Sequence, residues 1–321
     1  MRTIKFILLA TLIAFTATTS YAKKKKASPK DWSKVDFFDT YKVKTKFGKP
    51  ASKSLAKNLT FINDYSIKNA LKMKGMESNS NGTVHSAVTF AGIPRDKFQA
   101  MVDELYQQFQ DELTKVGLHL TNGDKLMKSD FVENKKSDRG AVVGKTNGEP
   151  ELEKASIIDQ MIPGYGALAV KEGINFRPLD KNIYYSTKKV APNFYQKLST
   201  LEDVNLISIS YYITFASFSG GRGYKNAVLQ TNSVISVMPI ITIVNPKGTY
   251  SYIAMEKGPI WGGVDWSLGV KQTDLNDLEY FGLATSAEYV IEADPDKYIK
   301  ELKDIIMNYQ VAIAKALKEN M

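Results

Sequence analysis

The sequence predicts an α/β (α+β-like) protein with a mixed, antiparallel-rich sheet of long strands covered by amphipathic helices, including a long C-terminal helix. Residues 94–116 and 294–319 repeat apolar side chains at spacings of three and four, as one-sided helices do. Residues 204–218 and 227–244 are rich in β-branched and aromatic residues, which favour long strands. Between residues 83 and 132 the order strand, helix, strand, helix is typical of an α/β layer.

Both long helices have recognisable ends. Pro94 suits a first helical turn and Gly117 suits a helix end, while Asp294 can cap a C-terminal helix that Pro295 opens. The apolar face of the first helix is expected to consist of Phe98, Met101, Val102, Leu105, Tyr106, Phe109, Leu113 and Val116. That of the second is expected to consist of Ile299, Leu302, Ile305, Ile306, Tyr309, Ile313, Ala316 and Leu317.

Shorter elements complete the predicted layer. Residues 83–90 alternate as a strand, residues 118–120 follow the first helix as a short strand, and residues 124–132 suggest another helix. A turn at 245–248 leads into a returning strand at 249–255. These elements place the two long strands in a sheet with neighbours on both sides.

The N-terminus has the pattern of a secretory signal peptide over residues 1–22. Arg2 and Lys5 precede the apolar stretch Phe6–Phe15, and Ser20–Ala22 offers the small residues that a signal peptidase reads. A membrane anchor or a buried helix is the alternative, but the apolar stretch falls short of the roughly 20 residues that a spanning helix needs. We therefore expect an exported protein, periplasmic or extracellular, without a transmembrane helix. Because the chain has no cysteine, it is not lipid-anchored through one.

The rest of the chain is expected to form one domain after a basic extension. Residues 23–60 suggest a basic linker and docking arm, and residues 61–321 suggest a single α/β domain with a surface excursion at 133–156. The extension begins with a four-lysine run that suits either peripheral contact with an anionic lipid or polymer, or a solvated tail. This run consists of Lys23, Lys24, Lys25 and Lys26.

Composition excludes several classes of chemistry. The chain has 43 Lys and Arg, 34 Asp and Glu, two histidines and a formal net charge of +9. Without cysteine it has no disulfide, thiolate metal site or cysteine nucleophile, and two histidines cannot form a three-histidine zinc site. His85 and His119 have no partner motif beside them. We therefore predict no metal, no cofactor and, because no nucleic-acid-binding motif accompanies the basic charge, no nucleic-acid partner.

Two glycine-containing segments only partly match catalytic motifs. Residues 140–146 have three residues between their glycines, where a phosphate-binding loop has four. Ser217–Gly221 has serine where a nucleophile elbow has its first glycine. We therefore predict no catalytic residues. Ser219–Gly223 is expected to connect two strands, or alternatively to bind an anion with Arg222.

The strongest binding candidate in the sequence is the glycine-rich segment 258–266. It contains Trp261 and Trp266, and exposed aromatic rings on a loop can stack on sugar rings or insert into a partner. The alternative is that both rings cap one end of the sheet. Trp261, Trp266 and Arg222 are the predicted ligand-binding residues.

Residues Val204–Glu256 carry a resemblance to a known family. Their strand, Gly-Gly segment, strand, turn and returning strand resemble the C-terminal half of the curli-secretion channel subunit family and its soluble periplasmic relatives. Phe109–Gly117 and the segments 118–120 and 124–126 are similar to that family's helix, strand and helix start. The family's usual Thr-Gly turn is Asn245–Gly248 here, and the lipid-anchor cysteine is missing. The resemblance implies a non-enzymatic envelope protein with an α/β core.

These observations together predict an exported, non-enzymatic binding or assembly factor of the cell envelope. Its expected partner is an envelope protein or a polysaccharide. Two alternatives remain at this stage. One is a secreted hydrolase with a dispersed active site. The other is an outer-membrane pore subunit whose strands at 204–244 contact the membrane.

Overall fold

The computed structural model describes most of the chain after residue 30. The described residues are 31–46, 54–79, 82–123, 126, 128–132, 143–145, 151–154, 169–179, 184–186, 194–222, 227–257, 259–262, 265–275 and 285–321. The predicted signal peptide at 1–22 and the four-lysine run at 23–26 lie outside these residues.

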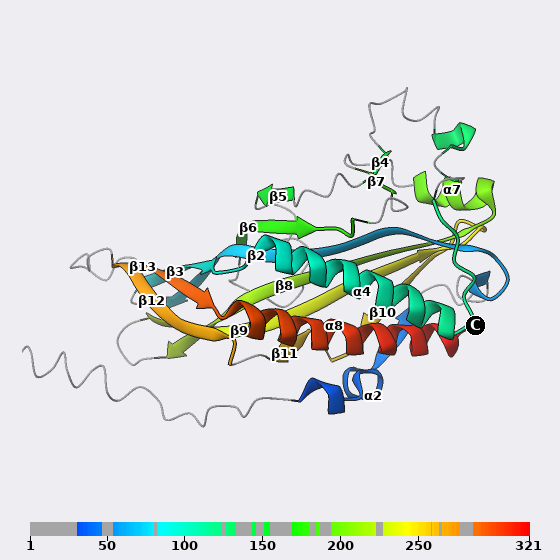
Figure 1. The fold of residues 1–321 in the computed structure, drawn as a ribbon. Helices are drawn as coiled ribbons and strands as arrows, with labels where there is room; N and C mark the ends of the chain where they lie inside the picture. Colours follow the sequence, from blue (N-terminus) through cyan, green and yellow to red (C-terminus); the bar gives the residue numbers. More distant parts are fainter. Residues whose placement is uncertain are drawn as a thin grey trace, which may run out of the picture.

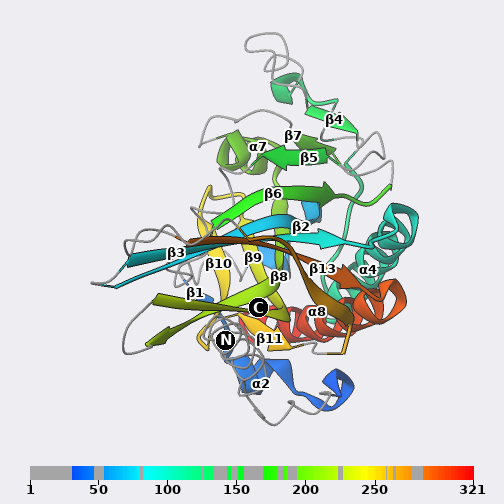
Figure 2. The same cartoon turned by 90° about the vertical axis from the view of Figure 1, so that its left-hand side faces the viewer.

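One large mixed sheet organises the described part of the chain (Figures 1 and 2). The strands in its main path are, in spatial order, β1 (Val43–Lys46), β10 (Tyr250–Met255), β9 (Ala227–Val244), β8 (Asn205–Arg222), β2 (Thr60–Asn79), β3 (Gly82–Ala91), β13 (Thr285–Ala293) and β12 (Ser267–Leu275). Joined to this path are β11 (Ile260–Gly262) on β9, β6 (Ala169–Phe176) on β2, and β5 (Glu151–Lys154) on β6. A separate pair consists of β4 (Val143–Lys145) and β7 (Tyr184–Ser186).

The predicted fold class is confirmed. The pairs β2–β8 and β3–β13 are parallel, and the other described pairs are antiparallel. The long hairpin of β8 and β9 runs in continuous register from Leu206 with Val244 to Arg222 with Ala227, apart from one shift after Thr214. The sheet is therefore mixed and rich in antiparallel pairs, as the strand pattern predicts.

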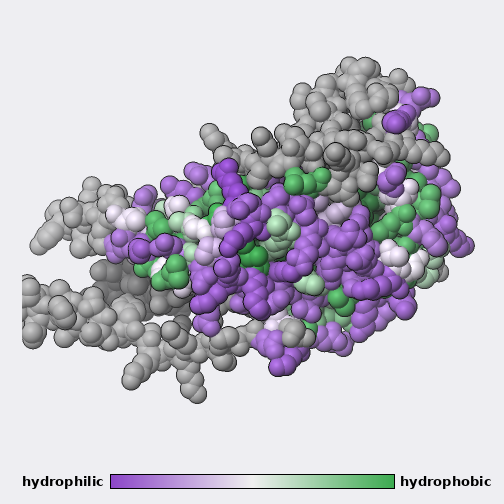
Figure 3. All heavy atoms as spheres, viewed as in Figure 1, coloured by the Kyte–Doolittle hydropathy of each residue, from purple (hydrophilic) through white to green (hydrophobic). Residues whose placement is uncertain are grey.

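Two long helices, α4 (Arg95–Lys115) and α8 (Pro295–Lys318), lie side by side on one face of this sheet (Figure 1). The carboxylate of Asp294 caps α8 by accepting a hydrogen bond from the backbone N–H of Lys297 at 3.2 Å. Seven of the eight predicted apolar residues of α4 are buried, and Val116 is half-buried. The outward side of the two helices is largely hydrophilic (Figure 3), so their amphipathic pattern is confirmed.

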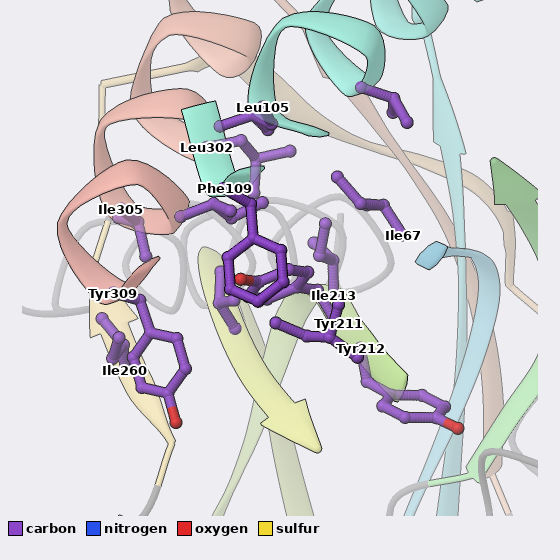
Figure 4. Packing of buried hydrophobic residues seen from close by; sticks show 14 of the residues in the cluster. Ile67, Leu105, Phe109, Tyr211, Tyr212, Ile213, Ile260, Leu302, Ile305 and Tyr309 are labelled. Atoms are coloured by element: carbon purple, nitrogen blue, oxygen red, sulfur yellow. The ribbon is translucent and has the colours of Figure 1, made fainter. Parts of the chain in front are cut away.

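The main core lies between these helices and the sheet. Leu105 and Phe109 from α4, with Leu302 and Tyr309 from α8, point toward Tyr211 of β8 (Figure 4). A smaller cluster lies on the opposite face, where the short helix α7 (Phe194–Glu202) covers one end of the sheet. Adjacent strand residues point to opposite faces, so Leu206 belongs to the smaller cluster and Ile207 to the main core.

Residues of the predicted docking arm also pack against the main core. They include a 3₁₀ turn, η1 (Trp32–Lys34), and a short helix, α2 (Phe37–Tyr41). Trp32 and Phe37 are almost fully buried, and their rings meet edge to face at 5.9 Å. The following strand, β1, pairs with β10. The sheet thus contains residues from both the predicted arm and the predicted domain.

Several elements differ from the sequence-based expectation. β2, β12 and β13 are strands that we did not predict. Conversely, residues 118–120 form only an isolated bridge, in which Leu120 pairs with Thr60. Ser219–Arg222 is not a connection between strands, because these residues continue β8 and pair with Ala227–Gln230. Pairing with β9 therefore keeps β8 extended through Gly220 and Gly221, although glycine is a poor strand former.

The contact between Trp32 and Glu301 of α8 makes the stability of the folded protein depend on pH. Its carboxylate accepts a hydrogen bond from the indole Nε1 of Trp32 at 2.6 Å. Burial raises the pKa of Glu301 above its ordinary value of 4.5, and the bond from Trp32 offsets this effect only in part. The folded state therefore favours the protonated acid. The stability that this preference contributes is complete below pH 4.5 and is lost as pH rises through the raised pKa.

We expect Glu301→Gln to remove this loss of stability at higher pH, because glutamine does not titrate. Its side-chain oxygen can still accept the hydrogen bond from Trp32. Urea unfolding at several pH values from 4 to 7 should show a free energy of unfolding that falls less steeply with pH than in the wild type. Glu319→Gln changes an exposed glutamate just beyond the end of α8 and serves as the control. A Glu301→Gln curve parallel to the wild-type curve would contradict this linkage.

Candidate functional site

The structure does not bring the sequence-predicted site residues together. Trp266 has an exposed fraction of 0%, and its ring packs against Phe90 at 5.5 Å and Tyr298 at 5.0 Å. The Trp266 ring therefore has no exposed face for a ligand and packs in the core instead. The backbone of Trp261 pairs with Ser236 on β9, and that of Arg222 pairs with Ala227. Their side chains lie outside the described part of the structure. Nine strand residues separate the two pairing positions on β9, which is roughly 30 Å.

The two histidines lie on different elements. His85 belongs to β3, and His119 follows α4, where its carbonyl oxygen accepts a hydrogen bond from the backbone N–H of Thr60 at 2.8 Å. Both histidines are exposed. Within the described residues, no cluster of three His, Cys, Asp or Glu side chains is arranged to hold a metal ion.

A half-open groove lies between α4, the segment after it, and the beginning of β2. Its volume is about 310 Å³. It is lined by Phe61 and Ile62 of β2, by Tyr106, Gln107, Gln110, Asp111 and Thr114 of α4, and by Leu120, Thr121 and Asn122. We take this groove as the candidate functional site, because a concave surface with apolar and convergent polar groups is the usual form of a binding site.

The end of α4 positions one wall of the groove. Gly117 has a φ of +98°, which glycine adopts without the strain that a side chain would bring. The chain turns there, and the N–H of Leu118 donates to the carbonyl oxygen of Leu113 at 3.1 Å. Thr60 then holds the returning segment through two backbone bonds, one to His119 and one from Thr121. Residues 120–122 are thereby fixed beside β2.

The groove has an apolar base and a polar rim. Phe61, Ile62 and Tyr106 are almost fully buried, whereas Gln107 and Asp111 are exposed. The Nε2 of Gln107 donates to the Oδ1 of Asp111 at 3.1 Å. Asp111 is the one carboxylate among the described lining residues, which otherwise contribute amides, hydroxyls and apolar groups. This lining suits a ligand that offers hydrogen-bonding groups and a positive charge.

Asn63 and Asp64, which follow the groove residue Ile62 on β2, take part in a cluster of polar side chains. Arg177 Nε and Asp64 Oδ1 are 3.5 Å apart, and both side chains are largely buried. Asn63 Oδ1 accepts a hydrogen bond from the hydroxyl of Ser208 at 3.0 Å. Burial, and secondly the charge of Asp64, raise the pKa of Tyr195 to about 12. The Tyr195 phenol therefore stays protonated at physiological pH.

Sequence reasoning missed the groove, although a signal for it exists on α4. Gln107, Gln110, Asp111 and Thr114 recur at i, i+3, i+4 and i+7, which places them on one stripe of the helix. The other walls come from β2 and the segment after α4, and their proximity follows from strand pairing that the sequence does not display.

No described helix combines the length and apolarity that crossing a membrane requires. Comparisons of the chain with protein-family models, curated proteins and solved structures found no match. The resemblance to the curli-secretion channel subunit family therefore stays a prediction, and the inferences below depend on the sequence and the geometry of this chain.

Proposed function

We propose that this protein is an exported, non-enzymatic binding or assembly factor of the cell envelope, which holds an envelope protein or a polysaccharide in the groove beside α4. The observation that carries the proposal is the groove itself, with its apolar base and its rim of amides and hydroxyls around Asp111. The signal-peptide pattern at residues 1–22 supports export.

The lining supports binding better than catalysis. Hydrolysis by general acid–base chemistry uses two carboxyl groups, or a nucleophile beside a base. The described lining residues include one carboxylate, Asp111, and no histidine, serine, lysine or cysteine. The hydroxyl of Thr114 donates to the carbonyl oxygen of Gln110 at 2.9 Å, so this hydroxyl is engaged by the helix backbone. Hydrogen bonding and apolar contact are what such a surface offers.

The test is to fill the groove without disturbing the fold. Thr114 is exposed on α4, and arginine is a good helix former, so Thr114→Arg should place a long side chain in the groove at little cost in stability. Ala100→Arg makes the same change at an exposed α4 position that does not line the groove. Retention of the mature protein on isolated envelope fractions, separated into proteins and cell-wall polysaccharide, would be measured for all three.

We expect wild type and Ala100→Arg to be retained on one of these fractions, and Thr114→Arg to bind at least about tenfold more weakly, a change of about 1.4 kcal/mol. Equal retention of Thr114→Arg would contradict a role for the groove. Absence of the wild-type protein from periplasmic and extracellular fractions of the expressing cell would contradict export.

A further inference from the structure

The side chains that a ligand can reach in the groove lie mainly on its rim. Phe61, Ile62 and Tyr106 form the base, but their exposed fractions are only 2%, 3% and 6%. The other lining residues are exposed or half-buried, and they are Gln107, Gln110, Asp111, Thr114, Leu120, Thr121 and Asn122. The described lining thus leaves little room for a large apolar side chain. A ligand held here binds mainly through the polar groups of the rim.

The rim has two sides that different segments hold in place. One side is a stripe of α4 that extends over roughly 10 Å, because its first and last residues are seven positions apart on the helix. It consists of Gln107, Gln110, Asp111 and Thr114. The other side contains Thr121 and Asn122, and the N–H of Thr121 donates to the carbonyl oxygen of Thr60 at 2.9 Å. Polar groups therefore line the groove from two directions.

Three neutral amides on this rim, termed the rim amides, can both donate and accept hydrogen bonds. They belong to Gln107, Gln110 and Asn122. Among the described residues, Gln110 and Asn122 form hydrogen bonds through their backbone carbonyl oxygens, and their side-chain amides form none. A side-chain amide offers donors on its nitrogen and an acceptor on its oxygen, and a sugar hydroxyl likewise does both. A hydroxyl-rich ligand can therefore satisfy the rim amides in either direction.

Asp111 adds a negative charge that no basic side chain of the described lining neutralises. Its Oδ1 accepts a hydrogen bond from the neutral amide of Gln107 at 3.1 Å. Lys115, one turn further along α4, forms an ion pair with Glu112 at 2.7 Å. The described lining residues include no lysine, arginine or histidine. The groove thus complements a ligand with an ammonium group and disfavours a phosphate, sulfate or carboxylate.

We propose that the groove binds an amino sugar within a glycan, with its ammonium group on Asp111 and its hydroxyl groups on the rim amides. This proposal rests on the proposed function and assigns a polysaccharide to the groove. A lysine of a partner protein would also pair with Asp111, but its long stem is apolar. The nearly buried base offers that stem little surface, and the rim amides would gain no partner from it. A sugar ring has hydroxyl groups beside its ammonium group, so it uses the charge and the amides together.

The test compares three probes of equal length by isothermal titration calorimetry on the mature full-length protein. They are an oligosaccharide of glucosamine, an oligosaccharide of N-acetylglucosamine, and a lysine oligomer. The titrations are made at pH 6, where the sugar amines are largely protonated. Acetylation removes the charge of the sugar, and the lysine oligomer has the charge without the ring. We expect the glucosamine probe to bind at least about tenfold more tightly than either of the others.

Two variants assign the contacts within the groove. Asp111→Asn removes the charge and keeps the shape, so it should abolish the preference for glucosamine over N-acetylglucosamine. Gln110→Leu removes an amide and keeps a good helix former, so it should weaken the glucosamine probe at least about threefold. Asp130→Asn, at an exposed position that does not line the groove, is the matched control and should bind all probes as the wild type does. Circular dichroism would check that each variant is folded.

Several results would overturn the proposal. Equal affinity of the wild type for the two sugars would show that the amine is not recognised. An unchanged preference in Asp111→Asn, or the same loss of preference in Asp130→Asn, would show that Asp111 is not its partner. Tighter binding of the lysine oligomer would make a basic protein segment the occupant of the groove.

The retention experiment with Thr114→Arg separates this inference from the proposed function. If Thr114→Arg loses retention on the envelope fractions while the glucosamine probe fails to bind the wild type, the amino-sugar assignment is wrong and the groove still acts as a binding site. If the wild type is retained on no envelope fraction and binds none of the three probes, both proposals fail.

Discussion

Gly262→Ala is expected to destabilise the protein about as much as Trp32→Ala does, by about 3–5 kcal/mol. Gly262 lies in β11, and the indole of Trp32 packs directly on its backbone. A Cβ at residue 262 would come within 2.6 Å of Trp32 Cη2 and closer still to Cζ2. Because both ring atoms belong to a rigid, buried side chain, the ring must leave its place. Urea unfolding followed by circular dichroism would measure the loss.

A double-mutant cycle tests whether the clash is the cause. In the Trp32→Ala background the space is already empty, so adding Gly262→Ala should cost no more than about 0.5 kcal/mol. The double variant should then be about as stable as Trp32→Ala alone. Additive losses would show that Gly262 matters for another reason, such as the pairing of β11 with β9, and would contradict the proposed contact.

The helices could be predicted from the sequence because their stabilising contacts follow a local period. Every third or fourth residue of α4 and α8 enters one core, and Asp294 supplies the cap within the chain itself. The central strand β2 lacks such a signal. It places Asn63, Ser66 and Asn69 in fully or almost fully buried positions, where each is bonded to a residue distant in sequence. Those partners compensate for burial of the polar atoms that they bond, and no local pattern reveals them.

The candidate site shows the same limit. Tryptophan in a glycine-rich segment suggested exposure, but Trp266 precedes β12, and its neighbours in space are Phe90 of β3 and Tyr298 of α8. The groove, by contrast, is formed by ordinary side chains of α4, of the segment after it and of β2, which come together only in the fold. The place of β2 in the sheet depends on pairings between residues more than a hundred positions apart, such as Thr60 with Asn205.

A buried hydrogen bond between the sheet and α8 provides the second large effect. The hydroxyl of Tyr298 donates to Asn69 Oδ1 at 2.7 Å, and both residues have an exposed fraction of 0%. Burial raises the pKa of Tyr298 far above its ordinary value, so its hydroxyl stays protonated and remains a donor. Either Tyr298→Phe or Asn69→Leu leaves one polar group buried without its partner. We expect each to cost about 1–3 kcal/mol in the free energy of unfolding.

The double variant and a control on the same helix decide whether the bond is responsible. When both partners become apolar, neither the Tyr298 hydroxyl nor Asn69 Oδ1 is left without the other, and only the bond from Asn69 Nδ2 to the carbonyl oxygen of Ala70 at 3.0 Å is still lost. Asn69→Leu with Tyr298→Phe should therefore lose less than the sum of the two single losses. Tyr309 is equally buried on α8, and its hydroxyl has no hydrogen-bond partner among the described residues. Tyr309→Phe should therefore be neutral or slightly stabilising. Equal losses for Tyr298→Phe and Tyr309→Phe would show that removal of any hydroxyl from this core is costly, and that the bond to Asn69 is not the cause.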